Sequence, residues 1–256
     1  MLGYALTGVL AAAAAGYLSK ALSFSGFVAT VIVGACISAS FGIKGVLLIG
    51  AFFVSSTIWS KYKEKQKEKN VITEKGSRRD IFQVMANGGI AAVASLGLIF
   101  FPSPVWTGVF VASIAGSNAD TWASELGVLS KGMPLSLRGF IRVQPGTSGA
   151  VSPFGTVAAL AGSLFIGGIA AFLFKLSLPD AIILAVAGFI GNLIDTFFGA
   201  FFQITYKCEK CGIESEKRFH CETRTSPVKG YYWLNNDTVN LLSSLLAGVI
   251  GGLALL

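Results

Sequence analysis

The sequence predicts an all-α, polytopic integral membrane protein with about eight transmembrane helices and three basic cytosolic loops. Of its 256 residues, 53% are hydrophobic and only 13% are charged. Apolar stretches of 17 or more residues recur along the whole length, and each is close to the roughly 20 residues that an α-helix needs to cross a bilayer core. A soluble helical bundle would interrupt such stretches with polar faces. We therefore expect residues 1–256 to form a single transmembrane domain.

The apolar stretches divide the chain into eight expected spans. The first span begins near the N-terminus without a basic segment before it, so we expect it to remain as a helix and not to be cleaved as a signal peptide. Residues 205–235 lie between the last two spans and are expected to form a cytosolic loop. The expected spans are Leu2–Leu18, Phe24–Ser40, Ile43–Ser60, Ile81–Phe101, Val105–Glu125, Phe154–Leu176, Ala181–Ile204 and Thr238–Leu256.

Basic residues are concentrated in three of the loops. The formal net charge is +7, and all but three of the 20 Lys and Arg side chains lie in residues 61–80, 131–142 and 207–229. The positive-inside rule then places these loops in the cytosol and both termini outside. Basic loops between apolar spans suit a lipid bilayer or phosphorylated substrates, so we expect no nucleic-acid partner. The Lys- and Glu-rich residues 61–69 predict a helical extension that anchors this topology.

Two carboxylates lie in the fifth span, within the segment Gly116–Gly127. Asp120 and Glu125 fall on one polar face of the expected helix, whereas the other face is apolar. Because a charged side chain inside a bilayer is energetically costly, it normally faces a bundle interior or a water-filled cavity, and it indicates a functional site. The alternative is a packing face on which small polar residues join helices, but such a face does not need two acids. The same polar face carries Ser117, Asn118, Thr121 and Ser124, which we expect to help bind the substrate or nucleotide.

The seventh and eighth spans repeat this design. Asp195 shares a polar face with Asn192 and with glycines that allow close approach of helices. Asn236 and Asp237 come directly before the eighth expected helix. Asn240 lies four residues after Asn236, within the first turn of that helix. With the topology above, the acids lie at the cytosolic helix ends or within two turns of them. We expect four acids to be catalytic, and they are Asp120, Glu125, Asp195 and Asp237.

A loop rich in glycine and hydroxyl groups precedes the sixth span, at residues 144–156. Ser152 is expected to cap this helix, with Pro153 as its first residue. Glycines let backbone N–H groups approach an anion, and a helix N-terminus adds positive potential, so the loop resembles a phosphate cradle. A turn-rich loop that re-enters the membrane is the alternative interpretation. The expected phosphate contacts are Gly146, Thr147, Ser148, Gly149 and Ser152, together with Arg138, Arg142 and Lys229.

Three of the four cysteines and the single histidine lie within fourteen residues of the third basic loop. The spacing C-x2-C followed by an adjacent His-Cys pair is typical of a closed, tetrahedral Zn²⁺ site. A cytosolic location disfavours disulfides, which leaves free or redox-active thiols as the alternative. Cys36, alone in an apolar span, is expected to be a packing residue. The expected zinc ligands are Cys208, Cys211, His220 and Cys221.

These side chains favour metal-dependent phosphate chemistry. The single histidine belongs to the cysteine set, so a Ser-His-Asp triad is not expected. Buried carboxylates beside asparagines suit Mg²⁺, which prefers one or two carboxylates and completes its shell with water and phosphate oxygens. Phosphoryl transfer mainly requires positioning and charge neutralisation, and a phosphate monoester acceptor is already an anionic nucleophile. A site at the membrane face also suits an acceptor with a tail in the bilayer.

Several motifs along the chain match one known family. They are Gly116–Thr121, Ala123–Gly127, Pro145–Thr147 with Gly149–Ser152 and Gly155–Thr156, Gly191–Gly199, the cysteine–histidine set, and Trp233–Asn240. On these motifs the chain resembles an integral membrane family that includes plant phytyl-phosphate kinase of tocopherol synthesis and many uncharacterised prokaryotic proteins. The resemblance implies transfer of a phosphoryl group from a nucleoside triphosphate, with CTP favoured over ATP, to a phytyl or polyprenyl monophosphate.

We therefore expect a Mg²⁺-dependent prenyl-phosphate kinase with a structural Zn²⁺ in its third basic loop. In this hypothesis the four acids hold or orient Mg²⁺, and the asparagines on the same helix faces complete its polar surroundings. A homodimer is compatible with the sequence. Two other functions stay open. One is a nucleotidyl transferase that forms a CDP-lipid, and the other is a transporter or flippase of lipid phosphates or cations that uses the same acids.

Overall fold

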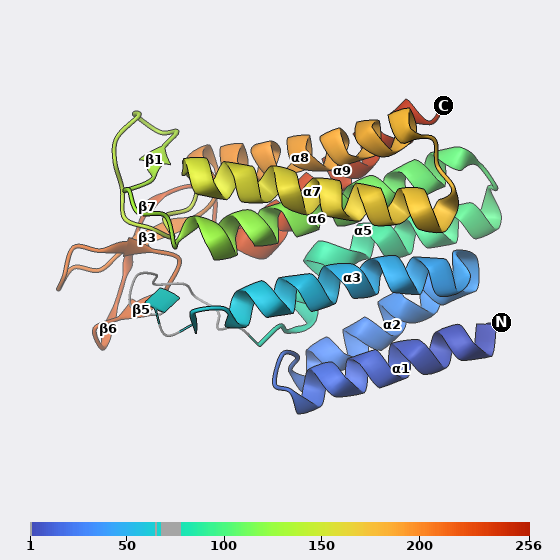
Figure 1. Cartoon of the computed structure of the whole chain (residues 1–256). Helices are drawn as coiled ribbons and strands as arrows, with labels where there is room; N and C mark the ends of the chain where they lie inside the picture. Colours follow the sequence, from blue (N-terminus) through green and yellow to red (C-terminus); the bar gives the residue numbers. More distant parts are fainter. Residues whose placement is uncertain (1, 65, 68–77) are drawn as a thin grey trace.

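Each expected span forms one helix in the computed structural model, which describes residues 2–64, 66–67 and 78–256 (Figure 1). The helices begin and end within three residues of the expected positions. The helical extension expected at residues 61–69 falls partly outside the described residues. The helices are α1 (Leu2–Leu18), α2 (Phe24–Ser40), α3 (Gly42–Lys61), α5 (Ile81–Phe100), α6 (Pro104–Gly127), α7 (Pro153–Phe174), α8 (Leu178–Phe201) and α9 (Asn236–Ala254).

Capping residues explain where the helices begin. Ser152 caps α7 as predicted, accepting a hydrogen bond from Gly155 N at 3.1 Å, and Pro153 is the first helical residue. α8 begins three residues before the expected position because Ser177 caps it and Pro179 lies in its first turn. An apolar run shows only where the hydrophobic residues start. The capping hydrogen bonds extend α7 and α8 beyond that run.

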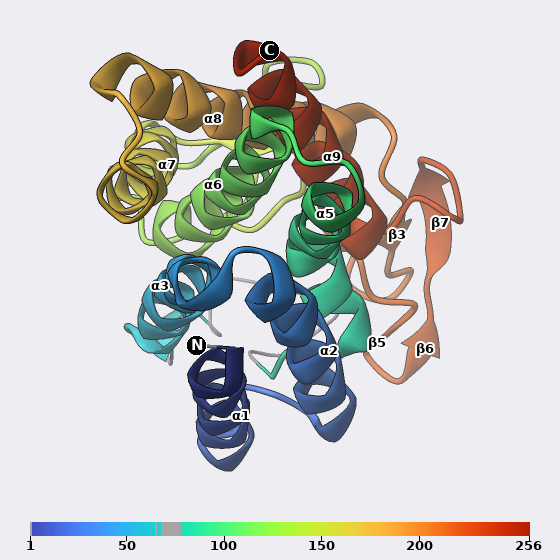
Figure 2. The ribbon, with the colours of Figure 1, turned by 90° about the vertical axis from the view of Figure 1, so that its right-hand side faces the viewer.

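α6 lies at the centre of the bundle (Figure 2). It packs against α3, α5, α7, α8 and α9, whereas α1 lies at the edge and packs against α2 and α3. Small residues allow α6 and α9 to approach each other closely. A Cβ atom built on Gly108 of α6 would lie only 2.2 Å from the carbonyl oxygen of Gly251 in α9. Phe110, Ile114 and Leu184 are fully buried in the same core. The helix that carries Asp120 and Glu125 is thus held firmly by its neighbours.

The helices have the lengths and composition of membrane spans. Within the described residues, α3, α5, α7, α8 and α9 are each long and apolar enough to cross a bilayer, and α1 and α2 are apolar helices of 17 residues. α6 has 24 residues and is more polar than these helices. Its polar side chains Ser113, Ser117 and Asn118 are buried among other helices, so they do not face lipid. Large apolar side chains are exposed on the outer helix faces, as a lipid environment favours. These features confirm the polytopic, helical membrane fold.

The described parts of the three basic loops lie at one end of the bundle, and both termini lie at the other end (Figure 1). The loop between α6 and α7 contains an antiparallel pair, β1 (Leu135–Ser136) and β2 (Ala150–Val151). The loop between α8 and α9 forms a ribbon at residues 205–229, in which β3 pairs with β4 and β7, and β5 pairs with β6. These strands are β3 (Thr205–Lys207), β4 (Glu214–Ser215), β5 (Phe219–His220), β6 (Thr223–Arg224) and β7 (Ser226–Lys229).

Candidate functional site

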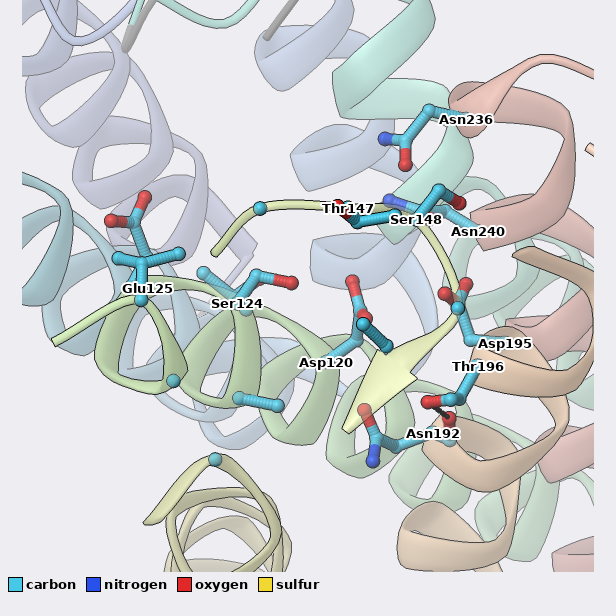
Figure 3. A pocket seen from close by; sticks show the side chains of 18 of the residues that line it. Asp120, Ser124, Glu125, Thr147, Ser148, Asn192, Asp195, Thr196, Asn236 and Asn240 are labelled. Carbon is cyan, nitrogen blue, oxygen red and sulfur yellow. Dashed lines mark hydrogen bonds between the residues drawn. The ribbon is translucent and has the colours of Figure 1, made fainter. Parts of the chain in front are cut away.

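A polar cavity of about 560 Å³ lies at the loop end of the bundle. Its walls come from α3, α5, α6, α8 and α9, and from residues 145–152, which we call the glycine-rich loop. Most side chains of the expected site line this one cavity, although they come from four separate parts of the chain (Figure 3). They are Asp120, Thr121, Ser124, Glu125, Gly146, Thr147, Ser148, Gly149, Ser152, Asn192, Asp195, Asn236, Asp237 and Asn240.

Asp120 of α6 and Asp195 of α8 face each other in this cavity (Figure 3). The two carboxylates lie close enough to interact electrostatically. Ser243 Oγ donates to Asp195 Oδ2 at 3.0 Å, and the Asn240 amide, oriented so that its nitrogen donates, lies 3.0 Å from the same oxygen. Two carboxylates this close are stable together only if they share a proton or a cation. The pair is therefore a candidate site for a divalent cation, and Asn192 lines the same cavity.

Glu125 occupies a different part of the cavity. Its carboxylate forms an ion pair with Lys67, in which Oε2 and Nζ are 2.6 Å apart, and it accepts a hydrogen bond from Ser60 Oγ at 2.6 Å. Asp237 lies in the first turn of α9 and also lines the cavity. Within the part of the chain that the structure describes, the four acids line one cavity but do not gather around a single point. The facing pair is the part of this set that suits one shared cation.

Two residues of the expected site lie behind the cavity and join helices. Ser117 Oγ donates to the Asn87 carbonyl oxygen at 3.1 Å and lies 2.8 Å from Ser244 Oγ. Asn118 Nδ2 donates to the Gly162 carbonyl oxygen at 2.7 Å. Both side chains are buried, and neither belongs to the cavity lining of the described residues. Small polar residues therefore do join helices here, but only on the deeper part of the polar face of α6.

Three basic residues expected to bind phosphate lie outside this cavity lining. Lys229 Nζ donates to the carbonyl oxygens of Gly199 and Ala200 at 2.9 Å each, so it neutralises the C-terminal end of α8. Burial lowers the pKa of Lys229, and the nearby Arg138 lowers this pKa further. Arg142 donates to a backbone carbonyl within its own loop. In this structure, the Lys229 and Arg142 side chains contact backbone carbonyls and do not line the cavity.

The cavity instead contains two other cations, Lys67 and Arg79. Arg79 Nη1 donates to Thr57 Oγ1 at 3.2 Å, and its guanidinium lies over the Phe53 ring, 5.4 Å from the ring centroid. Burial lowers the pKa of Arg79, while the nearby Glu125 raises it. An arginine stays protonated in a protein even under such burial. Arg79 is thus a fixed positive charge held at the cavity, and the general charge pattern did not single it out.

A spacing signal could have identified this part of the site. Arg79, Gln83 and Asn87 follow one another at intervals of four residues, and all three line the cavity. Residues four apart lie on one face of a helix, so the polar stripe of α5 continues directly from the arginine. The sequence interpretation takes residues 61–69 mainly as a topology anchor, with a substrate role as the lesser alternative, and it does not include this stripe.

The glycine-rich loop rests on the end of α8. Gly149 has a φ of +74°, and a Cβ atom at this position would lie 2.1 Å from Ala200 N. Ser148 Oγ donates to Gln203 Oε1 at 2.8 Å just beyond the same helix. Only a residue without a side chain fits at this point of contact between the loop and α8. Gly149 therefore determines how closely the loop packs on α8, and so where the loop lies beside the cavity.

We expect Gly149→Ala to lower the stability of the protein by about 1–3 kcal/mol relative to Gly139→Ala, because the new methyl group would collide with α8. Gly139 is a matched control, since it also has a positive φ (+83°) but nothing lies within 4 Å of an added Cβ. Thermal unfolding of both purified variants in detergent measures the difference. Equal melting temperatures would contradict this account of the loop.

The cysteine–histidine set lies in the ribbon, apart from the cavity. One ligand atom from each of Cys208, Cys211, His220 and Cys221 lies within 4.8 Å of the others, and within the described residues this is the only such group. The backbone of Cys211 and the side chain of His220 hydrogen-bond to the Cys208 thiol and lower its pKa to about 6. Loop residues that are thirteen positions apart in sequence thus meet at one point.

Comparison with known proteins identifies relatives along almost the whole chain. Protein VTE6, chloroplastic, of Arabidopsis thaliana is 31% identical over 242 residues, which are 91% of this chain and 65% of the relative. An uncharacterised membrane protein of Methanocaldococcus jannaschii is 30% identical, covering 91% of this chain and 85% of that protein. Protein PGR of Arabidopsis thaliana is 29% identical, covering 93% and 90%. No solved structure matches the chain.

A family model also matches almost the whole chain. The model is described as Integral membrane protein DUF92 and matches residues 7–248, which include every described residue that lines the cavity as well as the ribbon. VTE6 is a longer protein, and this chain spans 65% of its length. The extent of the family match shows that the chain belongs to the integral membrane protein family DUF92.

Proposed function

We propose that this protein is a membrane kinase that transfers a phosphoryl group from a nucleoside triphosphate, with CTP favoured, to a phytyl or polyprenyl monophosphate. The main support is the cavity itself, in which the facing acids Asp120 and Asp195 and the cations Lys67 and Arg79 line one polar space at the end of a membrane bundle. Such a combination suits a substrate complex that contains both a metal ion and several phosphates. The resemblance to a family that includes plant phytyl-phosphate kinase supports the substrate class.

The residues present fit Mg²⁺. Asp120 and Asp195 supply two carboxylates that face each other, and Asn192 adds an amide to the same cavity. This donor set matches a cation that prefers one or two carboxylates and leaves other positions to water and phosphate oxygens. When bound, Mg²⁺ would neutralise negative charge on the phosphates. Glu125 and Asp237 line the cavity beside this pair, where they can orient the polar groups around it.

The chain itself supplies the groups that position phosphate. Arg79 contributes a fixed charge and several N–H donors, and the glycine-rich loop adds backbone N–H groups next to the start of α7. An oxygen of the acceptor monophosphate forms a bond to the γ-phosphorus as the bond to the β–γ bridging oxygen breaks. The nucleoside diphosphate leaves, and the lipid becomes a diphosphate. The acceptor oxygen is already anionic, so this step needs no general base.

We propose that the cavity faces the cytosol. The described parts of the three basic loops lie at the same end of the bundle as the cavity, and positive loops are retained on the cytosolic side. This orientation gives the site direct access to cytosolic nucleotides. It also lets the acceptor keep its hydrocarbon tail in the bilayer while its phosphate enters the cavity.

An assay with purified protein tests the proposal. The protein in lipid nanodiscs is incubated with Mg²⁺, CTP or ATP, and phytyl or geranylgeranyl monophosphate, and the products are identified by mass spectrometry. We expect the lipid diphosphate together with the nucleoside diphosphate. A CDP-lipid with released pyrophosphate would show nucleotidyl transfer instead. If no nucleotide gives a product while the lipid phosphate crosses a liposome bilayer without nucleotide, the protein is a transporter and the kinase proposal is wrong.

A further inference from the structure

We propose that Cys208, Cys211, His220 and Cys221 bind one Zn²⁺, and that the zinc-bound ribbon supports the glycine-rich loop of the cavity. The first part concerns metal binding and is independent of the proposed kinase activity. The second part assigns the ribbon a positioning role at the cavity. Both parts follow from contacts at residues 203–221 and are tested without measuring turnover.

The four side chains have the spacing of ligands around one metal ion. Cys211 Sγ and Cys221 Sγ each lie 3.3 Å from His220 Nδ1, and the four ligand atoms lie within 4.8 Å of one another. In a tetrahedral site with Zn–S bonds of about 2.3 Å, neighbouring ligand atoms are about 3.5–3.8 Å apart. One Zn²⁺ would use all three thiols and the imidazole, whereas one disulfide would leave a thiol and the histidine unused.

The backbone around the set has the turns that such a site requires. Gly212 N donates to the Cys208 carbonyl oxygen at 2.8 Å, and Gly212 has a φ of +73°. This tight turn keeps Cys208 and Cys211 on the same side of the chain. Cys221 itself has a φ of +50° and lies between β5 and β6, next to His220. Glu222 also has a positive φ (+60°), so these two residues form the tight hairpin turn between β5 and β6, and this turn holds Cys221 beside His220.

The β5–β6 hairpin, which carries His220, buries little apolar surface. The strands of the ribbon are only two to four residues long, and β5 and β6 pair only with each other. A two-stranded pair of this length is marginally stable in water without further support. Phe219, the apolar side chain of β5, is 66% exposed and therefore contributes little burial. A bound metal would supply the missing stability by joining the Cys208 turn to the β5–β6 hairpin.

Hydrogen bonds connect this ribbon to the cavity. Glu216 directly follows β4, and its Oε1 accepts a hydrogen bond from Gln203 Nε2 at 2.6 Å. Gln203 is 1% exposed, and its Oε1 accepts from Ser148 Oγ of the glycine-rich loop at 2.8 Å. Glu216 and Ser148 both line the cavity. A ribbon fixed in place by zinc thus holds Gln203, and Gln203 in turn holds the loop.

Metal analysis tests the zinc site. The full-length protein is purified from cells supplied with zinc, and zinc is measured by mass spectrometry; we expect about one ion per chain. Cys36→Ser is the matched control, because this cysteine lies in α2 away from the ribbon, and it should keep the zinc. Cys211→Ser/Cys221→Ser should lose it. If that variant does not fold, a thiol-blocking mercurial added to the unaltered protein should release zinc to a colour indicator. Protein with intact thiols and no zinc would overturn the proposal.

Hydrogen exchange tests the support of the loop. Zinc is removed from the full-length protein with a chelator, and amide exchange is compared by mass spectrometry with and without metal. We expect faster exchange in residues 204–229 and also in residues 145–152, with α3 unchanged as an internal control. If exchange rises in the ribbon while the glycine-rich loop is unaffected, the ribbon does not support the loop. Failure of the kinase assay would leave both measurements valid, so the two proposals can fail separately.

Discussion

Asp195→Asn is expected to lower the rate of phosphoryl transfer by about 10²- to 10³-fold, the range found when one group that stabilises transition-state charge is removed. The carboxylate faces Asp120 and accepts a hydrogen bond from Ser243 Oγ at 3.0 Å. Asparagine has nearly the same shape but no negative charge, so it cannot help to hold a divalent cation as a carboxylate does. Initial rates of diphosphate formation at saturating lipid and nucleotide measure the effect.

Asp180→Asn is the matched control for this prediction. Asp180 lies in the first turn of the same helix at the opposite end, where its carboxylate accepts a hydrogen bond from Ser177 Oγ at 2.6 Å. This variant should retain full activity. Raising the Mg²⁺ concentration should partly restore Asp195→Asn, because a weakened cation site fills at higher concentration. Equal rates for the two variants would remove Asp195 from the catalytic site.

The helices were predictable because their signal is strong and local. The apolar runs are close to the length that crosses a bilayer, so the order of the helices in the described part of the chain follows from hydropathy. The start of α8 was missed by three residues because Ser177 and Pro179 set it, and these two residues lie outside the apolar run. The short strands of the ribbon were not predicted, since strands of two to four residues depend on tertiary contacts and leave little pattern in the sequence.

The acidic half of the cavity was predictable for a different reason. Asp120 and Asp195 lie in spans where carboxylates are costly, so each is conspicuous on its own. The basic half was not predictable in the same way, because a lysine or arginine in a loop suits topology and substrate binding equally well. The charge pattern could not show that Lys229 binds the end of α8 while Arg79 lines the cavity. That distinction depends on how the loops fold back onto the helices.

Arg79→Met is expected to lower kcat/KM roughly 30-fold or more, because removing one partner of a buried charged contact costs about 2 kcal/mol or more. The guanidinium is held beside the cavity by Thr57 Oγ1 and the Phe53 ring, so it is fixed in place before a phosphate arrives. The loss should appear mainly in KM for the phosphorylated substrates if Arg79 binds the ground state. Steady-state kinetics with varied nucleotide and varied lipid phosphate separate the two substrates.

The neighbouring arginine provides the control. Arg78 donates through Nε to the Leu22 carbonyl oxygen at 2.9 Å, its guanidinium lies over the Tyr17 ring, and it is not part of the cavity lining of the described residues. Arg78→Met removes the same charge one position away, so it tests whether a general loss of positive charge from the loop explains the effect. We expect its KM values to stay close to those of the unaltered protein. If both variants raise KM equally, the basic loop acts through its overall charge, and Arg79 has no specific contact with phosphate.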